Sequence, residues 1–246
     1  MISKSQIKLI KSLKLKKHRI ASKLFLVEGM KSILEVIKSN YEVVKIVTTK
    51  SAIKNYKAIF SGLDIEFTSE KTLSSVGNFT TNNSGIAVVK MMDSFKGIIN
   101  PSNYSIVLDG INDPGNLGTI IRTADWYGIE NIICSMDSVD VYNPKVIQSS
   151  MGSFTRVNVY YRDLEKLFQE SKLKVYGAVL DGINYHKEKF IKKGILLLGN
   201  ESNGIRPNLN KFIDRKISIY GDGKAESLNI AISSALILDK IINSKK

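Results

Sequence analysis

The sequence is poor in the residues that build disulfides and metal centres. It contains one cysteine, Cys134, and two widely separated histidines, His18 and His186. A single cysteine cannot form an internal disulfide, and its place in an apolar run predicts a small buried hydrophobe in a reducing compartment. A zinc site needs a cluster of thiolate and imidazole ligands, so we expect no metal.

Long apolar runs are also missing. Ile195–Leu198 is only as long as a strand, and no run reaches the length of a membrane-spanning helix. No apolar segment follows the basic N-terminus, so we expect neither a secretory signal nor membrane association. We therefore predict a cytoplasmic protein, and 246 residues suffice for one large or two small domains.

Acidic residues are outnumbered by basic ones, 23 against 36, which gives a formal net charge of +13. The first forty residues hold ten lysines and arginines and two glutamates, so +8 of the +13 lies there. Such clustering favours a polyanion, with nucleic acid the leading candidate. The alternative is a lysine-rich composition that simply fills solvated faces.

The order of predicted elements indicates an α/β protein. Residues 2–17 have the pattern of a basic amphipathic helix, and strands and helices alternate after it. Residues 92–104 carry Gly, Pro, Asn and Ser without periodicity, which is typical of a linker. We place the boundary near Gly97, with a smaller domain at 1–97 and a larger one at 98–246. Helices are predicted over 28–38, 52–60, 116–127, 144–151, 163–170 and 228–242, with strands between them.

Three apolar strands in the second half end in glycine-bearing turns. They lead into Asp109–Asn116, Gly199–Pro207 and Gly221–Asn229. The first turn precedes a helix that carries Arg122, which fits either an anion site or an ordinary strand–turn–helix unit with a surface arginine. The third turn matches neither the dinucleotide fingerprint, because Glu226 stands at its third glycine, nor a P-loop, so NAD and ATP are poorly supported.

Taken together, these stretches resemble the three signature motifs of the SpoU (TrmH-like) RNA 2′-O-ribose methyltransferases of the SPOUT class. Asp113–Asp125 resembles motif one, Leu198–Ile205 motif two and Ser227–Ser233 motif three, and Pro144–Phe154 resembles a segment between the first two. More weakly, the first half resembles the family's L30e-like RNA-binding domain. The resemblance implies a parallel-sheet domain with a deep trefoil knot, S-adenosylmethionine as cofactor, and a homodimer through the C-terminal domain.

The resemblance also assigns residues. The catalytic positions would be Arg122, Asn116, Glu201, Ser227 and Asn229. The cofactor would be held around Val179, Leu180, Gly199, Asn200, Ile219, Gly221 and Leu228. RNA would be bound by Lys14, Lys16, Lys17, Arg19 and Lys31.

Several alternatives stay open at this point. Arg122 is often proposed as a base in the family, but a guanidinium stays protonated, so it could instead clamp a phosphate and stabilise the developing alkoxide. Asn116 and Ser227 could be helix caps. Ribosomal RNA is a more natural target than transfer RNA for a basic N-terminal domain, and a non-catalytic RNA-binding protein of the same fold is the second hypothesis.

Overall fold

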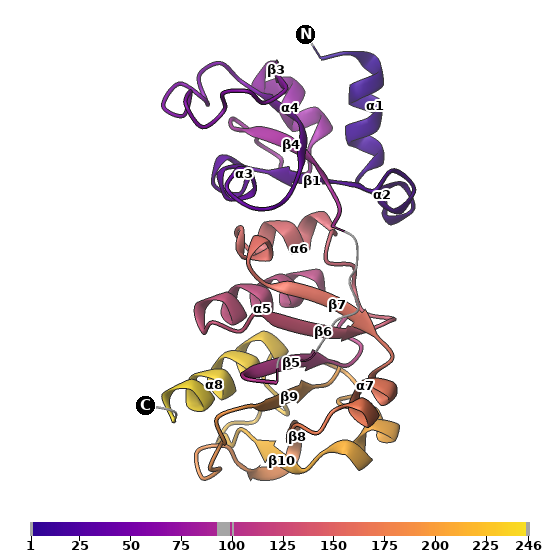
Figure 1. Cartoon of the computed structure of the whole chain (residues 1–246), viewed down its shortest axis with the longest axis vertical. Coiled ribbons are helices and arrows are strands. Elements are labelled where there is room, and N and C mark those ends of the chain that lie inside the picture. The colour runs from indigo at the N-terminus through magenta and orange to yellow at the C-terminus, as the bar shows by residue number, and fades with distance from the viewer. Residues whose placement is uncertain (1, 93–98, 100, 245–246) are drawn as a thin grey trace. The chain divides into compact units, whose positions relative to one another are not determined.

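The computed structural model describes residues 2–92, 99 and 101–244, and the chain divides into two compact units (Figure 1). Unit 1 comprises Met1–Asp93 and Asp140–Thr155, and unit 2 comprises Ser94–Val139 and Arg156–Lys246. The expected boundary near Gly97 lies outside the described residues. Among the residues that the structure describes, no helix is long and apolar enough to cross a membrane.

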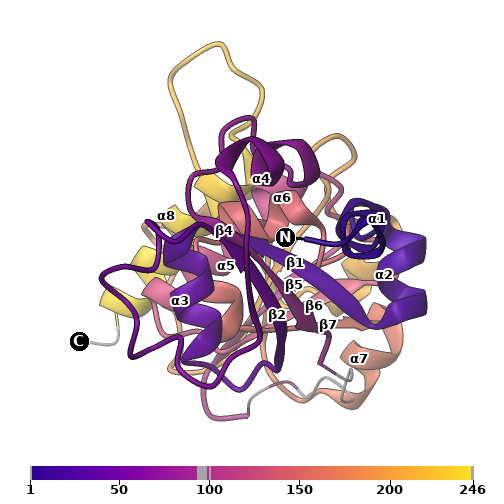
Figure 2. The same ribbon diagram turned by 90° about the horizontal axis from the view of Figure 1, so that it is seen from above.

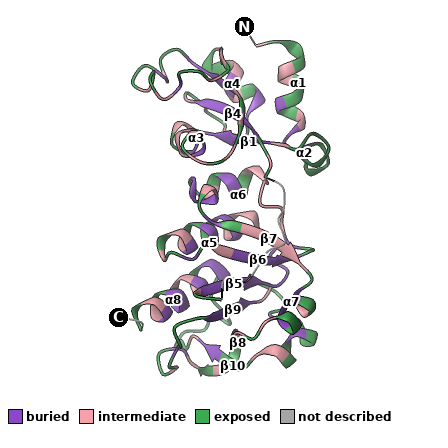
Figure 3. Cartoon of the chain, viewed as in Figure 1, coloured by how far each residue is buried: buried purple, intermediate pink, exposed green. Residues whose placement is uncertain are grey.

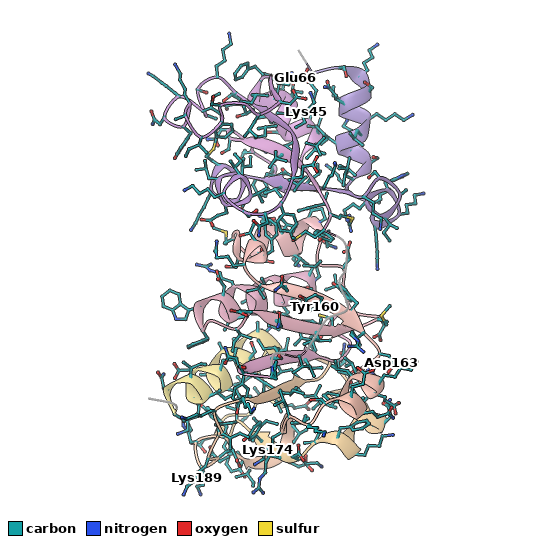
Figure 4. The ribbon with its side chains drawn as sticks, viewed as in Figure 1. Lys45, Glu66, Tyr160, Asp163, Lys174 and Lys189 are labelled. Carbon is teal, nitrogen blue, oxygen red and sulfur yellow. The ribbon has the colours of Figure 1, made fainter. Side chains whose placement is uncertain are left out.

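Unit 1 is built on a mixed sheet of four strands in the order β1-β4-β2-β3. The strands are β1 (Leu24–Glu28), β2 (Val43–Thr48), β3 (Ile65–Phe67) and β4 (Gly85–Lys90). Strand β4 is antiparallel to both neighbours, and β2 is parallel to β3. Lys45 of β2 pairs with Asp64 at 2.8 Å and lies beside Glu66 of β3 (Figure 4).

The helices of unit 1 are α1 (Lys4–Ser12), α2 (Lys16–Ser22), α3 (Met30–Ile37) and α4 (Glu70–Val76). The predicted single helix over 2–17 is wrong, because the chain turns at Leu13–Leu15 and begins again at Lys16. Ile10 and Leu13 still pack on Leu26 and Val88 of the sheet, as the amphipathic pattern requires. The helix predicted over 52–60 is a run of turns whose amides bond mostly three residues back.

A segment from the second half of the chain completes unit 1. It contains α6 (Pro144–Ser149) and the 3₁₀ turn η1 (Ser153–Thr155), and α6 packs on β1. The ring of Phe25 on β1 lies 4.6 Å from that of Tyr142 and 6.0 Å from that of Phe154. The hydrophobic core of unit 1 therefore draws on residues more than a hundred positions apart.

Unit 2 holds a parallel sheet of six strands in the order β10-β8-β9-β5-β6-β7. Its strands are β5 (Tyr104–Leu108), β6 (Asn131–Ser135), β7 (Asn158–Arg162), β8 (Val175–Asn184), β9 (Gly194–Leu198) and β10 (Arg215–Ser218). The central strands β5 and β9 are buried along their whole length (Figure 3). Strands buried on both faces explain why these segments are continuously apolar rather than alternating.

Helices cover the sheet of unit 2. Helices α5 (Pro114–Trp126) and α8 (Ile230–Asn243) pack on each other (Figure 1). Helix α7 (Leu164–Glu170) is capped by Asp163 (Figure 4) and packs with the 3₁₀ segment η2 (Pro207–Phe212) over Val107 and Leu197. The expected α/β class, with a smaller N-terminal and a larger parallel-sheet domain, is confirmed.

Candidate active site

The motif-one and motif-two stretches follow neighbouring strands. Because β5 and β9 are parallel, their carboxyl ends meet at the same edge of the sheet, where open α/β sheets place ligands. The amide of Asp109 donates to the carbonyl of Leu198 at 2.9 Å and extends this pairing past the strand ends. Gly110 then turns the chain with a φ of 73°, a conformation that favours glycine.

Helix α5 begins two residues earlier than predicted. Asp113 is its N-cap and accepts from the amide of Asn116 at 2.8 Å, and Pro114 occupies the first helical position. Asn116 is therefore inside the first turn and is not the cap. This leaves its side-chain amide available for contacts with other loops.

One chain of hydrogen bonds joins all three motifs. Asn116 Nδ2 donates to Glu201 Oε1 at 2.7 Å, and Asn229 Nδ2 donates to Asn116 Oδ1 at 2.9 Å. Asn229 is also the N-cap of α8, since its Oδ1 accepts from the amide of Ala231 at 2.9 Å. The bonds leave Asn116 a single orientation, with its NH₂ toward the carboxylate and its oxygen toward Asn229.

Arg122 and Ser227 are not part of this chain. Arg122 is exposed on α5 and has no hydrogen-bond or ion-pair partner within the described part of the chain. It lies one helical turn before Trp126, which is 84% exposed, so the two share a face of the helix. Ser227 is exposed in the segment between β10 and α8, which Figure 2 shows as a long loop. It caps no helix.

The expected cofactor residues lie on three loops of unit 2. Val179 and Leu180 belong to an excursion in β8, because Lys216 of β10 pairs with Gly177 while the next residue, Ile217, pairs with Ile183. The carbonyl of Leu180 accepts from the hydroxyl of Ser218 at 3.0 Å. Leu180 is 75% exposed. Further along, Ile219 is partly buried, and Gly221 and Leu228 are exposed.

Gly199 and Asn200 shape the motif-two loop. A Cβ at Gly199 would overlap the backbone of Gly204 and Ile205, so this position requires glycine. Asn200 and Gly204 exchange two backbone hydrogen bonds of 2.9 Å, and Asn200 Nδ2 donates to the carbonyl of Gly110 at 2.7 Å. Gly221 differs, because a Cβ there would meet nothing within 4 Å among the described atoms.

Sequence reasoning missed an ion-pair cluster at the same edge. The buried carboxylate of Asp109 accepts from the amide of Arg206 at 2.8 Å and from its Nε at 2.6 Å, and Nη2 is also paired with it. The outer nitrogens of Arg206 reach Asp137 at 3.4 Å. The hydrogen bond to Asp109 raises the pKa of Arg206. The Ser135 hydroxyl and then Arg206 lower the pKa of Asp137. An arginine just before Pro207 and an aspartate just after a buried strand were the only signals in the sequence.

In unit 1 the expected RNA-binding residues differ in exposure. Lys16, Lys17 and Lys31 are exposed, and Lys14 is partly buried with its amine on the carbonyl of Gly77. Arg19 is 2% exposed, and its guanidinium donates to Asp140 at 2.7 Å and to the carbonyls of Leu13 and Lys14. The prediction that Arg19 binds RNA is therefore corrected: its donors are used to hold segment 140–155 within unit 1.

No group of three or more potential metal ligands occurs among the residues that the structure describes. Cys134 is buried in β6, and burial raises the pKa of its thiol well above the ordinary value. A thiol in that state is a poor nucleophile and a poor metal ligand.

Each of the two units matches a known family of domains. The model of the SpoU rRNA methylase family matches residues 103–239, and that of an MRM3-like substrate-binding domain matches residues 4–87. The 23S rRNA (guanosine(2553)-2′-O)-methyltransferase RlmP of Bacillus subtilis is 31% identical over 232 residues, which cover 93% of this chain and 92% of the relative.

Solved structures agree over the full length. A TrmH-family protein from Porphyromonas gingivalis is 31% identical with a TM-score of 0.86, and the match covers 99% of each chain. An AdoMet-bound rRNA methyltransferase from Sinorhizobium meliloti is 26% identical with a TM-score of 0.86, over 98% of this chain and 96% of the other. The chain thus belongs to the SpoU rRNA methylase family of RNA ribose 2′-O-methyltransferases, and membership implies the family's trefoil knot in the parallel-sheet domain.

Proposed function

We propose that this enzyme methylates the ribose 2′-hydroxyl of a guanosine in 23S ribosomal RNA, at the edge of unit 2 where the three motifs meet. The observation that carries the site is the hydrogen-bond chain from Glu201 through Asn116 to Asn229. The choice of RNA is supported by the Bacillus subtilis relative, which matches nearly the whole chain. Transfer RNA remains the second candidate target.

The residues around the excursion in β8 fit S-adenosylmethionine. Leu180 and Leu228 are exposed and Ile219 is partly buried. These three apolar residues offer surface for an adenine ring. The open space at Gly221 and the close turn at Gly199–Gly204 offer backbone groups for ribose and amino-acid atoms. Val179 and Asn200 flank these positions. When bound, S-adenosylmethionine supplies a methyl group already activated by its sulfonium.

The side chains of this edge then have two tasks, to position the 2′-hydroxyl and to accommodate its developing negative charge. Positioning alone can lower a barrier by ~7–11 kcal/mol in favourable cases. The exposed, unpaired Arg122 has its five donors available for the target phosphate and the developing alkoxide. Glu201, Asn116 and Asn229 hold the loops that surround the hydroxyl. Ser227 is exposed in the third motif, and we assign it an orienting role toward the substrate.

We infer that unit 2 pairs with a second copy through α5 and α8. Trp126 is exposed at the end of α5, and Ile232 and Leu236 are exposed one turn apart on α8. A concavity of about 520 Å³ lies beside them, lined by Tyr127, Tyr185, Leu236 and Asp239 among others. Tryptophan is enriched at protein–protein interfaces, so the exposed Trp126 beside these apolar residues supports the pairing. Because Arg122 shares its helix face with Trp126, the pairing would place each Arg122 beside the partner.

We propose that residues 1–97 form the substrate-binding domain and residues 98–246 the methylase domain, with segment 140–155 contributing to the core of the first. Exposed Lys16, Lys17 and Lys31 supply its contacts to RNA phosphates. A buried thiol and an RNA substrate support a cytoplasmic location.

The decisive experiment incubates the enzyme with tritiated S-adenosylmethionine and, separately, unmodified transcripts of 23S rRNA, 16S rRNA and tRNA. We expect label in 23S rRNA at one guanosine, whose ribose methylation protects the following linkage from alkaline cleavage. Label only in tRNA would replace the proposed target, and label in no RNA while the cofactor binds would contradict it.

A further inference from the structure

The motif-two loop is joined to the motif-one loop at three points. Asn200 Nδ2 donates to the carbonyl of Gly110, Glu201 accepts from Asn116, and Arg206 pairs with Asp109. The first two contacts lie near the start of the motif-two loop, just after β9 ends at Leu198, and the third closes the loop before η2 begins at Pro207. Glu201, whose carboxylate accepts from Asn116, lies between the contacts made by Asn200 and Arg206.

The contact between Arg206 and Asp109 differs from the other two because one of its side chains is fully buried. The Asp109 side chain is 0% exposed, whereas that of Arg206 is 45% exposed. Three nitrogens of Arg206 converge on the Asp109 carboxylate, and one of them is the backbone amide. Charge-assisted, multidentate bonds of this kind fix position and angle together. The pair therefore fixes backbone position as well as side-chain position at the end of the loop.

We propose that Arg206 and Asp109 are positioning residues for methyl transfer, which act by fixing Glu201 against Asn116. The inference rests on the proposed roles of Glu201 and Asn116. We assign Arg206 no contact with a reacting atom, because its guanidinium is turned to Asp109 and, more weakly, to Asp137. If the ion pair is removed, Gly199 keeps its place in the loop. Glu201 is then no longer held in one position against Asn116.

The first test replaces both members together, Asp109→Asn with Arg206→Gln, so that no charge is left buried without a partner. The matched control is Arg162→Gln with Glu170→Gln, which removes an ion pair of 2.9 Å on β7 and α7 of the same unit. All proteins are assayed with 23S rRNA transcript at a temperature where circular dichroism shows them folded. We expect kcat at saturating S-adenosylmethionine to fall about 10- to 100-fold in the first variant. KM for the cofactor should change less than kcat, and the control should match the wild type.

The second test asks whether Arg206 acts through Glu201. Arg206→Lys keeps the positive charge but loses the planar guanidinium that binds a carboxylate through two nitrogens. The substitution is measured alone and combined with Glu201→Gln. We expect Arg206→Lys to lower kcat about tenfold in the wild-type background and less than about twofold once Glu201 has been changed, because coupled residues are not additive. Equal factors in both backgrounds would overturn the inference. So would a folded double variant of Asp109 and Arg206 with wild-type kcat.

The same measurements separate the inference from the proposed function. If Glu201→Gln leaves kcat unchanged, the role assigned to Glu201 fails, whatever Arg206 does. If Glu201→Gln lowers kcat but Arg206→Lys does not, the role of Glu201 stands and the inference about Arg206 fails.

Discussion

The side-chain amide of Asn116 donates to the carboxylate of Glu201, 85 positions further along the chain, at 2.7 Å. The same side chain accepts from Asn229, 113 positions away, at 2.9 Å. One asparagine thus uses both ends of its amide to connect the three motifs. An ionised aspartate has no donor and a leucine has neither a donor nor an acceptor, so neither can make both bonds.

We predict that Asn116→Asp is more damaging than its near-identical size suggests. The change removes the donor and sets a second carboxylate against Glu201, and like charges at that separation repel. We expect kcat to fall about 100-fold in the transcript assay, equivalent to about 2.7 kcal/mol. Thr123→Ala on the same helix is the control, because among the described residues its hydroxyl bonds only to the carbonyl of Thr119. An Asn116→Asp enzyme with normal turnover would show that the connection is dispensable.

Arg122→Ala should abolish methyl transfer and leave cofactor binding intact, because the cofactor residues lie on other loops. Titration calorimetry with S-adenosylmethionine and the transcript assay measure the two properties independently. Arg122→Lys should recover little activity, since a point charge does not replace the planar fork on a phosphate. Arg162→Ala, at an arginine on β7 whose partner is Glu170, serves as the control. Retained turnover in Arg122→Ala would remove the arginine from the mechanism.

Gly199→Ala and Gly221→Ala should separate stability from cofactor affinity. At Gly199 the new methyl group meets the backbone of Gly204 and Ile205, so we expect a loss of about 1–3 kcal/mol in the free energy of unfolding. At Gly221 there is room, so the unfolding free energy should change by no more than about 0.5 kcal/mol. Affinity for S-adenosylmethionine should nevertheless fall at Gly221. Urea denaturation and calorimetry measure the two effects, and the reverse ranking of stabilities would contradict the geometry.

Arg19→Met should destabilise unit 1 and not merely weaken RNA binding. It leaves the Asp140 carboxylate, whose side chain is mostly buried, without the partner at 2.7 Å, a change that typically costs about 3–5 kcal/mol. The contrasting variant replaces Lys16, Lys17 and Lys31 by alanine. That variant should keep its melting temperature but bind 23S rRNA more weakly and with a shallower salt dependence. If Arg19→Met melts like the wild type, the pair does not hold segment 140–155.

Trp126→Glu should yield a monomer in multi-angle light scattering if α5 and α8 form the proposed interface. A buried aromatic anchor is costly to replace by a charge, whereas an exposed one is not. The control is Met136→Glu, at another exposed apolar residue of unit 2 that lies after β6. A Trp126→Glu protein with the mass of the wild type would exclude this face as the interface.

The sequence alone determined the fold class and the order of the motifs. The apolar run Ile195–Leu198 predicts a strand, and β9 forms there and is buried throughout. Local chemistry also predicted most helices of the second half to within a few residues, because a start signal such as Pro144 acts over one turn. At α5 the prediction was two residues late, because Asp113–Pro114 belongs to the helix start and not to the preceding turn. The helix prediction failed over 52–60, where the backbone forms successive turns instead of a helix.

Only the tertiary structure decided which side chains meet. Asn116, Glu201 and Asn229 come together because strand order places the ends of β5 and β9 side by side, and strand order is not written in local sequence. The same applies to Asp109 with Arg206, and to Arg19, whose charge suggested RNA until Asp140 was found beside it. A sequence states which groups are charged or polar. Long-range pairing determines which of them are consumed inside the fold and which, like Arg122, remain available to a substrate.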